Sequence, residues 1–195
     1  FLDKCIAASH YYNIKPIIVF NKIDLLDSKE IQNLKIINDN YTRLGILFIE
    51  VSATDGLGIQ ELNKNLRNKK TLFIGNSGVG KSTIINKVSK SNQKINNLSS
   101  KTGRGKQTTT FSEIFEIDSN SFIVDSPGFK DFYFYGIDKS EVKYLFNDFI
   151  EIQKECKFNN CLHLEEPQCQ IKNNIGKKIW SKRYSSYLSI MGELK

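Results

Sequence analysis

Residues 75–82 read Gly75-Asn76-Ser77-Gly78-Val79-Gly80-Lys81-Ser82, and this octapeptide decides the fold. It matches the G-x-x-x-x-G-K-S pattern of a phosphate-binding loop, which connects a buried strand to a helix. An apolar run at 71–74 precedes it, and we expect a helix over 81–88. Glycines let backbone N–H groups approach phosphates closely, and the N-terminus of the helix adds a positive dipole. The stretch therefore predicts an α/β protein that binds a nucleotide.

Two side chains of the octapeptide carry specific roles in this pattern. We expect the ammonium of Lys81 to reach the β- and γ-phosphates of the nucleotide. The hydroxyl of Ser82 is expected on Mg²⁺, a hard cation that prefers oxygen ligands.

A second motif indicates which base is bound. Asn21-Lys22-Ile23-Asp24 follows an apolar run at 16–20, and Ser52-Ala53-Thr54 follows a predicted strand at 46–51. The carboxylate of Asp24 can accept both N–H donors of guanine, and adenine lacks that pair, so an ATP-using enzyme is disfavoured. We expect Asn21 to brace this loop, Lys22 to cover the base and the Ala53 N–H to meet the guanine oxygen. The alternative for such a tetrapeptide is a solvated turn.

The order of these motifs is unusual. In ordinary P-loop GTPases the phosphate loop opens the domain and the base-selecting motifs close it, whereas here the base-selecting motifs come first. The sequence therefore predicts a circularly permuted P-loop GTPase with a doubly wound, mostly parallel sheet. We also expect a helix over 28–44, a short helix over 58–66, a hairpin of 110–117 with 121–124, and a polar loop over 89–106.

Two further segments resemble the switches of a GTPase. Asp125-Ser126-Pro127-Gly128 fits D-x-x-G, in which Asp125 would touch Mg²⁺ through water and the Gly128 N–H would contact the γ-phosphate. Residues 103–110 look like the first switch, with Thr109 favoured over Thr108 as the Mg²⁺ ligand. Phe129 cannot orient a water molecule, so Gln107 is the nearest candidate for that catalytic role.

Cysteine and histidine residues are grouped near the C-terminus. Cys156, Cys161, His163 and Cys169 form C-x₄-C-x-H-x₅-C, a ligand set that suits tetrahedral, structural Zn²⁺. The alternatives are a disulfide or cysteines scattered in a core.

Charge distribution points to a polyanionic partner. The net charge is +7, and no acidic residue lies between Glu61 and Glu113. A basic surface there suits the nucleotide phosphates or an RNA backbone, and compositional drift toward Lys, Asn and Ile is the alternative. No apolar run approaches the roughly 20 residues of a membrane span and no signal peptide precedes the first motif, so we expect a cytoplasmic protein without membrane contact.

At this level of detail the chain resembles the RsgA family, also called YjeQ, over nearly its whole length. The resemblance rests on the permuted motif order, on the stretch from Cys156 to Cys169 and on Arg183-Tyr184-Ser185-Ser186-Tyr187. It implies GTP and GDP contacts along residues 21–24, including Ile23, and along 75–83, including Thr83. It also implies zinc on the Cys/His residues, a GTPase domain at 1–135 and a helical zinc-binding module at 136–195.

The resemblance further implies a function. RsgA proteins are monomeric GTPases that act in late maturation of the small ribosomal subunit, bind its rRNA and are stimulated by the ribosome. Family members usually carry histidine at the position of Gln107 and glycine at that of Gln168. The alternative function is a catalytically weak, nucleotide-gated RNA-binding assembly factor.

RsgA proteins begin with an OB-fold domain and a strand that precede the first helix of this chain. In a Ras-like sheet that strand lies between the strand before the phosphate loop and the strand before Asn21. We therefore expect a fragment of a longer chain, with a gap between these two strands.

Overall fold

The computed structural model describes residues 1–89, 94–97, 112–126, 134 and 136–194, and the chain divides into two compact units. The first, here called the sheet unit, contains Ile18–Ile36 and Phe48–Asp131. The second, the helical unit, contains Phe1–Ile17, Ile37–Leu47 and Phe132–Lys195. The nucleotide motifs lie in the sheet unit and the Cys/His cluster lies in the helical unit.

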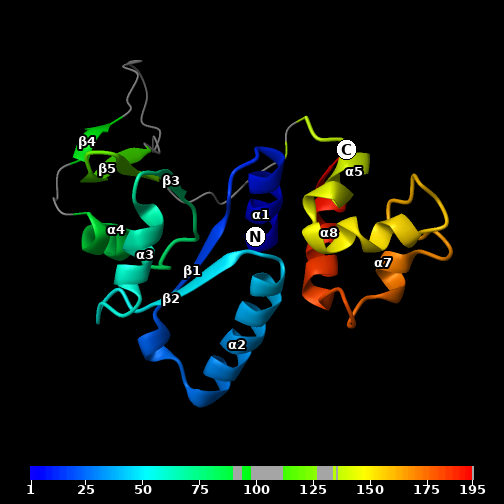
Figure 1. Ribbon diagram of the computed structural model, residues 1–195, viewed down its shortest axis with the longest axis horizontal. Coiled ribbons are helices and arrows are strands. Elements are labelled where there is room, and N and C mark those ends of the chain that lie inside the picture. The colour runs from blue at the N-terminus through cyan, green and yellow to red at the C-terminus, as the bar shows by residue number, and fades with distance from the viewer. Residues whose placement is uncertain (90–93, 98–111, 127–133, 135, 195) are drawn as a thin grey trace. The chain divides into compact units, whose positions relative to one another are not determined.

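The strands of the sheet unit form two separate sheets (Figure 1). One consists of β1 (Ile17–Asn21) and β2 (Leu47–Val51). The other has the order β3-β6-β5-β4, with β3 (Lys70–Phe73), β4 (Lys94–Asn97), β5 (Glu113–Asp118) and β6 (Ser121–Asp125). Within the described residues no strand connects β1 to β3.

The four-stranded sheet is mixed. β3 and β6 run parallel, whereas β5 is antiparallel to both β6 and β4. The predicted hairpin is therefore confirmed as β5 and β6. The prediction of a loop over 89–106 was wrong at residues 94–97, because these residues form β4. A Lys-Ile-Asn-Asn segment has little strand propensity of its own, and its strand conformation depends on backbone pairing with β5.

Helices of the sheet unit follow the predicted apolar spacing. α3 (Ile59–Leu66) buries Ile59, Leu62 and Leu66, and α4 (Lys81–Val88) buries Ile84, Ile85 and Val88. A short 3₁₀ helix, η1, covers Ile23–Leu25.

Helix α2 (Ser28–Arg43) has residues in both units. It starts at a reciprocal pair, in which the Glu30 N–H donates to Asp27 and the Asp27 N–H donates to Glu30. It ends before Gly45, which has φ +76° and supplies the left-handed residue that commonly stops a helix.

The helical unit surrounds one apolar core. Its elements are α1 (Leu2–Tyr11), α5 (Lys139–Val142), η2 (Lys143–Leu145), α6 (Asn147–Ile150), η3 (Ile152–Glu155), α7 (Gln170–Asn173) and α8 (Ser181–Glu193). Phe146, Phe149 and Tyr187 pack their rings against one another, with centroids 5.1–5.4 Å apart. α1 lies beside α8 (Figure 1), and the two helices are joined by an ion pair of Lys4 with Glu193.

A buried ionic cluster joins four helices of this unit. Arg183 of α8 is 2% exposed and donates to Asp3 of α1 at 2.6 Å and to Asp148 of α6 at 2.9 Å. Tyr41 of α2 donates its hydroxyl to Asp3 at 3.0 Å. Burial, together with the charge of Asp3, raises the pKa of Tyr41 well above its usual value, so the phenol stays a donor. Each buried charged group of the cluster therefore has a hydrogen-bond partner.

In the part of the chain that the structure describes, none of the helices combines the length and the apolar character that crossing a membrane requires.

Removal of the Arg183 charge should destabilise the helical unit strongly. Arg183→Met leaves two carboxylates near each other in a nonpolar setting, and we expect it to lower the free energy of unfolding by about 3–5 kcal/mol. Tyr41→Phe removes one hydrogen bond and should cost about 1 kcal/mol. Urea denaturation followed by circular dichroism measures both. Equal losses for the two variants would contradict the role given to the guanidinium.

Candidate functional site

β3, the strand before the phosphate loop, and β6, the strand that ends at Asp125, are neighbours in the sheet. Phe73 of β3 is in register with Asp125 of β6, and the two strands run parallel. Ser126 reinforces this junction, because its hydroxyl donates to the Phe73 carbonyl at 2.9 Å. The carboxyl ends of parallel strands meet at one edge of a sheet, where α/β proteins bind their ligands. The phosphate loop and Asp125 therefore leave the sheet side by side.

Glycines give the phosphate loop its conformation. Gly78 and Gly80 have φ of +81° and +92°, a left-handed region that glycine adopts without cost. α4 begins at Lys81, directly after Gly80. The ammonium of Lys81 donates to the Gly75 carbonyl at 2.9 Å, across the mouth of the loop, and Ser82 and Thr83 are exposed in the first turn of α4. This is the geometry expected of a cradle for phosphates.

Asn21 connects the three motifs. Its amide nitrogen donates to the Val79 carbonyl in the phosphate loop at 3.0 Å, and its amide oxygen accepts the Ala53 N–H at 3.1 Å. A Cβ at Gly80 would lie 2.3 Å from the same amide nitrogen, so only glycine leaves room for this contact. The base-selecting turn, the Ser-Ala-Thr loop and the phosphate loop therefore meet at one side chain.

The rest of the base-selecting turn lies around this junction. Lys22 has φ +71° and donates its ammonium to the Gly78 carbonyl at 2.8 Å, and the Asp24 side chain is exposed in η1. Ser52 is buried, and its hydroxyl accepts the Asp55 N–H at 3.2 Å and contacts the Thr54 hydroxyl. The Ala53 N–H is predicted to donate to the guanine oxygen, and in this structure it donates to the Asn21 side chain.

Asp125 is suited to a cation. One of its carboxylate oxygens is buried without a hydrogen-bond partner among the described residues. Burial raises the pKa of Asp125, while the charge of Lys81 lowers it and that of Glu113 raises it. An orphaned buried carboxylate oxygen beside the phosphate loop fits the water-mediated Mg²⁺ contact expected of D-x-x-G. Gln107, Thr109 and Gly128, the remaining predicted switch residues, lie outside the described residues.

The Cys/His residues form a cluster in the helical unit. The ligand atoms of Cys156, Cys161, His163 and Cys169 all lie within 4.8 Å of one another. His163 Nδ1 is 3.8 Å from Cys156 Sγ and 3.5 Å from Cys169 Sγ. A tetrahedral zinc site with Zn–S near 2.3 Å separates its ligand atoms by roughly 3.5–3.8 Å. The donor set and its spacing therefore fit a closed, four-coordinate metal site.

Four side chains that sequence analysis did not single out as site residues hold the loop that carries these ligands. Glu166 accepts the N–H groups of Leu162 and Leu164. The carbonyl groups of the loop accept from Tyr187, Tyr184 and Lys143, at Leu162, His163 and Cys161 respectively. The i, i+3 spacing of Tyr184 and Tyr187 in α8 is the signal that sequence reasoning had available. The backbone partners of Lys143, Tyr184 and Tyr187 lie 18, 21 and 25 residues away in the chain, so no local pattern encodes them.

The loop at 156–169, which carries the four Cys/His residues and is here called the metal loop, has two residues with left-handed backbone angles. His163 has φ 60° and Gln168 has φ 59°. Glycine is the residue that adopts this region most easily, which explains why a glycine suits the position of Gln168.

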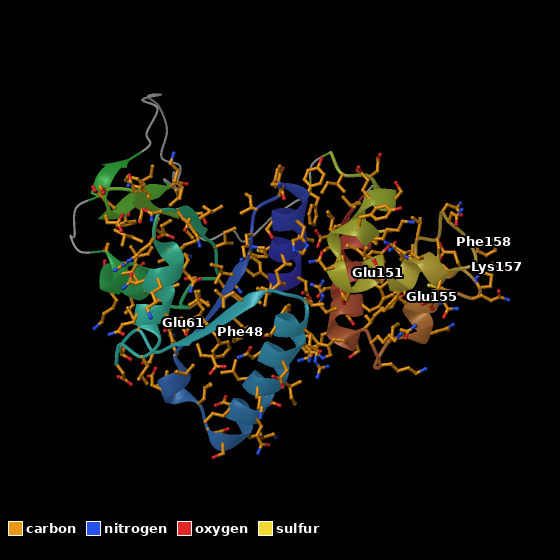
Figure 2. The ribbon with its side chains drawn as sticks, in the orientation of Figure 1. Phe48, Glu61, Glu151, Glu155, Lys157 and Phe158 are labelled. Carbon is orange, nitrogen blue, oxygen red and sulfur yellow. The ribbon has the colours of Figure 1, made fainter. Side chains whose placement is uncertain are left out.

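Lys157 and Phe158, at the outer end of the loop, are exposed with Glu151 and Glu155 (Figure 2).

Burial has opposite effects on the protonation of the thiols and of the imidazole in this cluster. Burial raises the pKa of the Cys161 and Cys169 thiols, so these groups are neutral in the metal-free protein at neutral pH. Burial, with the charge of Lys143, lowers the pKa of His163 to about 4, so its imidazole is neutral and available as a ligand. Metal binding would therefore release protons from the thiols.

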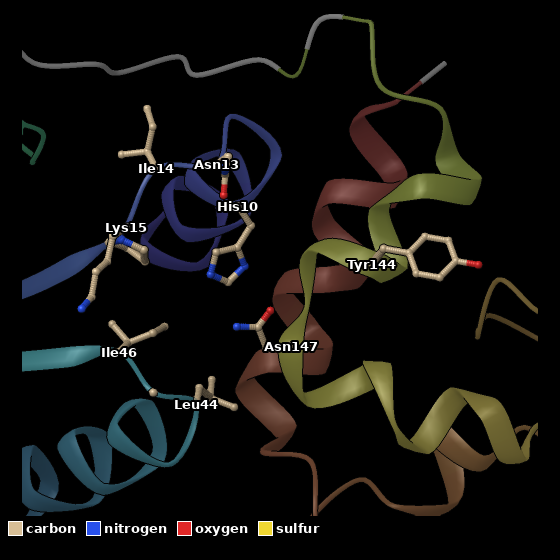
Figure 3. Close-up of a pocket in the computed structure, with 10 residues that line it drawn as sticks. His10, Asn13, Ile14, Lys15, Leu44, Ile46, Tyr144 and Asn147 are labelled. Atoms are coloured by element: carbon tan, nitrogen blue, oxygen red, sulfur yellow. The ribbon is translucent and has the colours of Figure 1, made fainter.

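A cavity of about 470 Å³ lies elsewhere in the helical unit (Figure 3). His10 of α1 and Asn147 of α6 both line it. His10 is half-buried, and its Nδ1 lies 2.8 Å from the Leu145 carbonyl. Because a carbonyl can only accept, Nδ1 carries the proton, and the histidine ties α1 to η2.

The chain is similar to a known family of GTPases. The RsgA GTPase family model matches residues 1–135. The small ribosomal subunit biogenesis GTPase RsgA of Flavobacterium psychrophilum is 38% identical over 193 residues, which are 98% of this chain and 59% of that protein. The protein of the same name from Borrelia garinii subsp. bavariensis is 40% identical and covers 100% of this chain and 62% of its own length.

Solved structures agree with these matches. YjeQ from Thermotoga maritima superimposes with a TM-score of 0.81 at 29% identity, over 99% of this chain and 64% of that one. YloQ, described as a circularly permuted GTPase, gives a TM-score of 0.77 at 26% identity, over 98% and 61% of the two chains. The chain thus spans about three fifths of the length of these relatives. With the family model matched over most of its residues and its permuted nucleotide motifs joined at Asn21, the chain belongs to the RsgA GTPase family.

Proposed function

We propose that this chain binds GTP and hydrolyses it to GDP, and that it acts as a monomer in the cytoplasm during maturation of the small ribosomal subunit. The observation that carries the proposal is the Asn21 junction, at which a guanine-selecting turn and a phosphate loop are joined in one site. Relatives that are 38% and 40% identical to this chain are named small ribosomal subunit biogenesis GTPases, which supports the partner. The RNA of that subunit suits the basic stretch between Glu61 and Glu113.

Each part of the site has a role in this reaction. The backbone of residues 75–80 and Lys81 hold the phosphates, and the exposed carboxylate of Asp24 accepts the two N–H donors of guanine. In this proposal Ser82 would hold Mg²⁺ directly and Asp125 through water, while Thr83 would contact the nucleotide. The cation would neutralise charge that develops on the γ-phosphate. Gln107 orients the attacking water, and Thr109 and Gly128 contact the cation and the γ-phosphate in this proposal.

The Cys/His cluster has a structural role in the proposal. Cys156, Cys161, His163 and Cys169 would hold one zinc ion, which would cross-link the loop between η3 and α7. The chain's own residues fix the imidazole, because His163 Nε2 lies 3.5 Å from Gln153 Oε1. An acceptor on that side leaves the proton on Nε2 and turns the Nδ1 lone pair toward the sulfurs. A closed ligand set of this kind stabilises a fold and leaves no position for a substrate.

Asp24→Ala should weaken GTP binding without changing the fold. The exposed Asp24 side chain makes the two base contacts, and their loss should raise the Kd for GTP by about 5–150-fold. Titration with a fluorescent GTP analogue measures the change, and competition with unlabelled ATP measures selectivity. Equal competition by ATP and GTP in the unaltered chain would show that the guanine assignment is wrong.

Small ribosomal subunits should accelerate GTP hydrolysis. A P-loop site without a supplied arginine hydrolyses GTP slowly, on the order of 10⁻⁴–10⁻² s⁻¹, so a partner that orders the site raises the rate. Phosphate release is measured with and without subunits, and Lys81→Ala is the control that should abolish both rates. Tight GTP binding without stimulated release would instead favour a nucleotide-gated RNA-binding factor.

Zinc removal should make the stability of the chain sensitive to mild acid. We expect one zinc per chain by elemental analysis, and none in Cys161→Ser. In the metal-free chain the pKa of His163 is about 4, below the ordinary value of 6.5. The unfolded state therefore binds a proton that the folded state excludes, and stability should fall as the pH drops from about 6.5 to about 4.

Thermal melts of the chelator-treated chain at several pH values check this, and His163→Asn is the matched variant. The expected result is a smaller drop in Tm across this pH range for the variant than for the parent. Identical profiles for the two proteins would contradict the assignment of the titration to His163.

A further inference from the structure

A second hollow in the helical unit has a basic and aromatic lining. It has a volume of about 260 Å³, and Arg43, Lys177, Lys178 and Trp180 contribute to its wall. Arg43 ends α2, whereas the other three residues belong to the turn between α7 and α8. None of these residues takes part in the nucleotide site or in the metal cluster. The pocket therefore has cations whose role the proposed GTPase reaction leaves unexplained.

The charge of this lining is positive. Arg43, Lys177 and Lys178 are exposed, and the carboxylate that also lines the pocket, Asp148, is already paired with Arg183 at 2.9 Å. Arg183 is shared between Asp148 and Asp3, so this cluster keeps one excess negative charge, which the three exposed cations outnumber. Such a concave positive surface attracts anionic groups.

The turn that presents the two lysines is held in one conformation. The N–H of Gly176 donates to the Ile179 carbonyl at 2.8 Å, and the N–H groups of Lys177 and Ile179 donate to the Asn174 carbonyl. The Ile179 side chain is fully buried and anchors the turn in the core. Lys177 and Lys178 therefore extend from a backbone that does not need to be ordered when a ligand binds.

Trp180 adds an aromatic surface to the cations. Its ring is half-buried, contacts the Tyr41 ring edge-to-face and has the Lys182 ammonium 5.3 Å from its centroid. Cations that contact phosphates beside a ring that stacks on a base are the combination that binds single-stranded nucleic acid. An acidic peptide would use the cations but has no base to stack on the indole. The size of the pocket suits one nucleotide unit and not a duplex.

We propose that the pocket of Arg43, Lys177, Lys178 and Trp180 binds single-stranded RNA, with a phosphate on the cations and an adjacent base on the indole. This inference rests on the proposed function and assigns one contact surface to its RNA partner.

Trp180 is the only tryptophan in the sequence, so its fluorescence reports on this pocket alone. We expect a 12-nucleotide oligouridylate to quench that emission saturably in the zinc-loaded chain. Lys177→Glu with Lys178→Glu should weaken binding at least tenfold. Alanine at both positions should lower the slope of log K against log salt by about 1.4, since each single-strand phosphate contact contributes about 0.7.

The matched control is Lys29→Glu with Lys139→Glu, which changes the net charge equally at exposed positions outside the pocket. It should change binding much less than the pocket reversal. Gly176→Ala retains every charge but places a side chain at φ +77°, so it should also weaken binding if the shape of the turn matters.

Several outcomes would overturn the proposal. One is that oligouridylate does not bind, or binds by anisotropy without changing Trp180 emission. Another is that the pocket and control charge-reversal variants weaken binding equally. A third is that polyglutamate quenches Trp180 as strongly as oligouridylate. GTP binding is measured in the same variants. Intact GTP binding with unchanged Trp180 emission rejects the RNA pocket alone, whereas loss of GTP binding in the unaltered chain rejects the proposed function.

Discussion

The side-chain amide of Asn21 is the contact on which the nucleotide site depends. It uses its donor on the Val79 carbonyl and its acceptor on the Ala53 N–H, so two loops distant in the sequence share one side chain. A carboxylate would repel the carbonyl and an apolar residue would leave both backbone groups unpaired. The close approach of Gly80 to the same amide shows how little space the junction has. Permuting the order of the motifs leaves this contact intact, because the contact is spatial.

Helix α8 performs the corresponding role in the helical unit. Its Arg183 pairs with both Asp3 and Asp148, and its Tyr184 and Tyr187 donate to carbonyl groups of the metal loop. The ligand geometry therefore depends on a helix that supplies no ligand. Asp3 lies in α1 and accepts from Arg183, so α1 is tied to the helix that holds the metal loop. Buried ionic and hydrogen-bonding groups of this kind are costly to leave unpaired, so the packing of these helices is coupled.

Local pattern was sufficient for much of the fold and of the candidate site. The spacing of apolar residues placed α2, α3, α4 and the β5–β6 hairpin within a few residues, because periodicity reports which face of an element is buried. The phosphate loop was recognisable because its glycines and Lys81 are needed at fixed spacing. β4 was missed because a Lys-Ile-Asn-Asn segment has low strand propensity, and its pairing with β5 is not visible in the local sequence. Lys143 was missed because its partner is a backbone carbonyl 18 residues away, and Glu166 because it accepts from backbone N–H groups of its own loop, which no residue-type pattern indicates.

From residue types alone we could predict a nucleotide site, the base that Asp24 is suited to accept and the four side chains of the Cys/His cluster. These follow from residue types at short, fixed spacing. Only the tertiary structure decided that Asn21 joins three loops, that Arg183 is enclosed by two carboxylates, and that Arg43 lies in one pocket with Lys177, Lys178 and Trp180. Each of these brings together residues that are 30 or more positions apart in the sequence. Their proximity in space is set by how the core packs and not by any local preference of the chain.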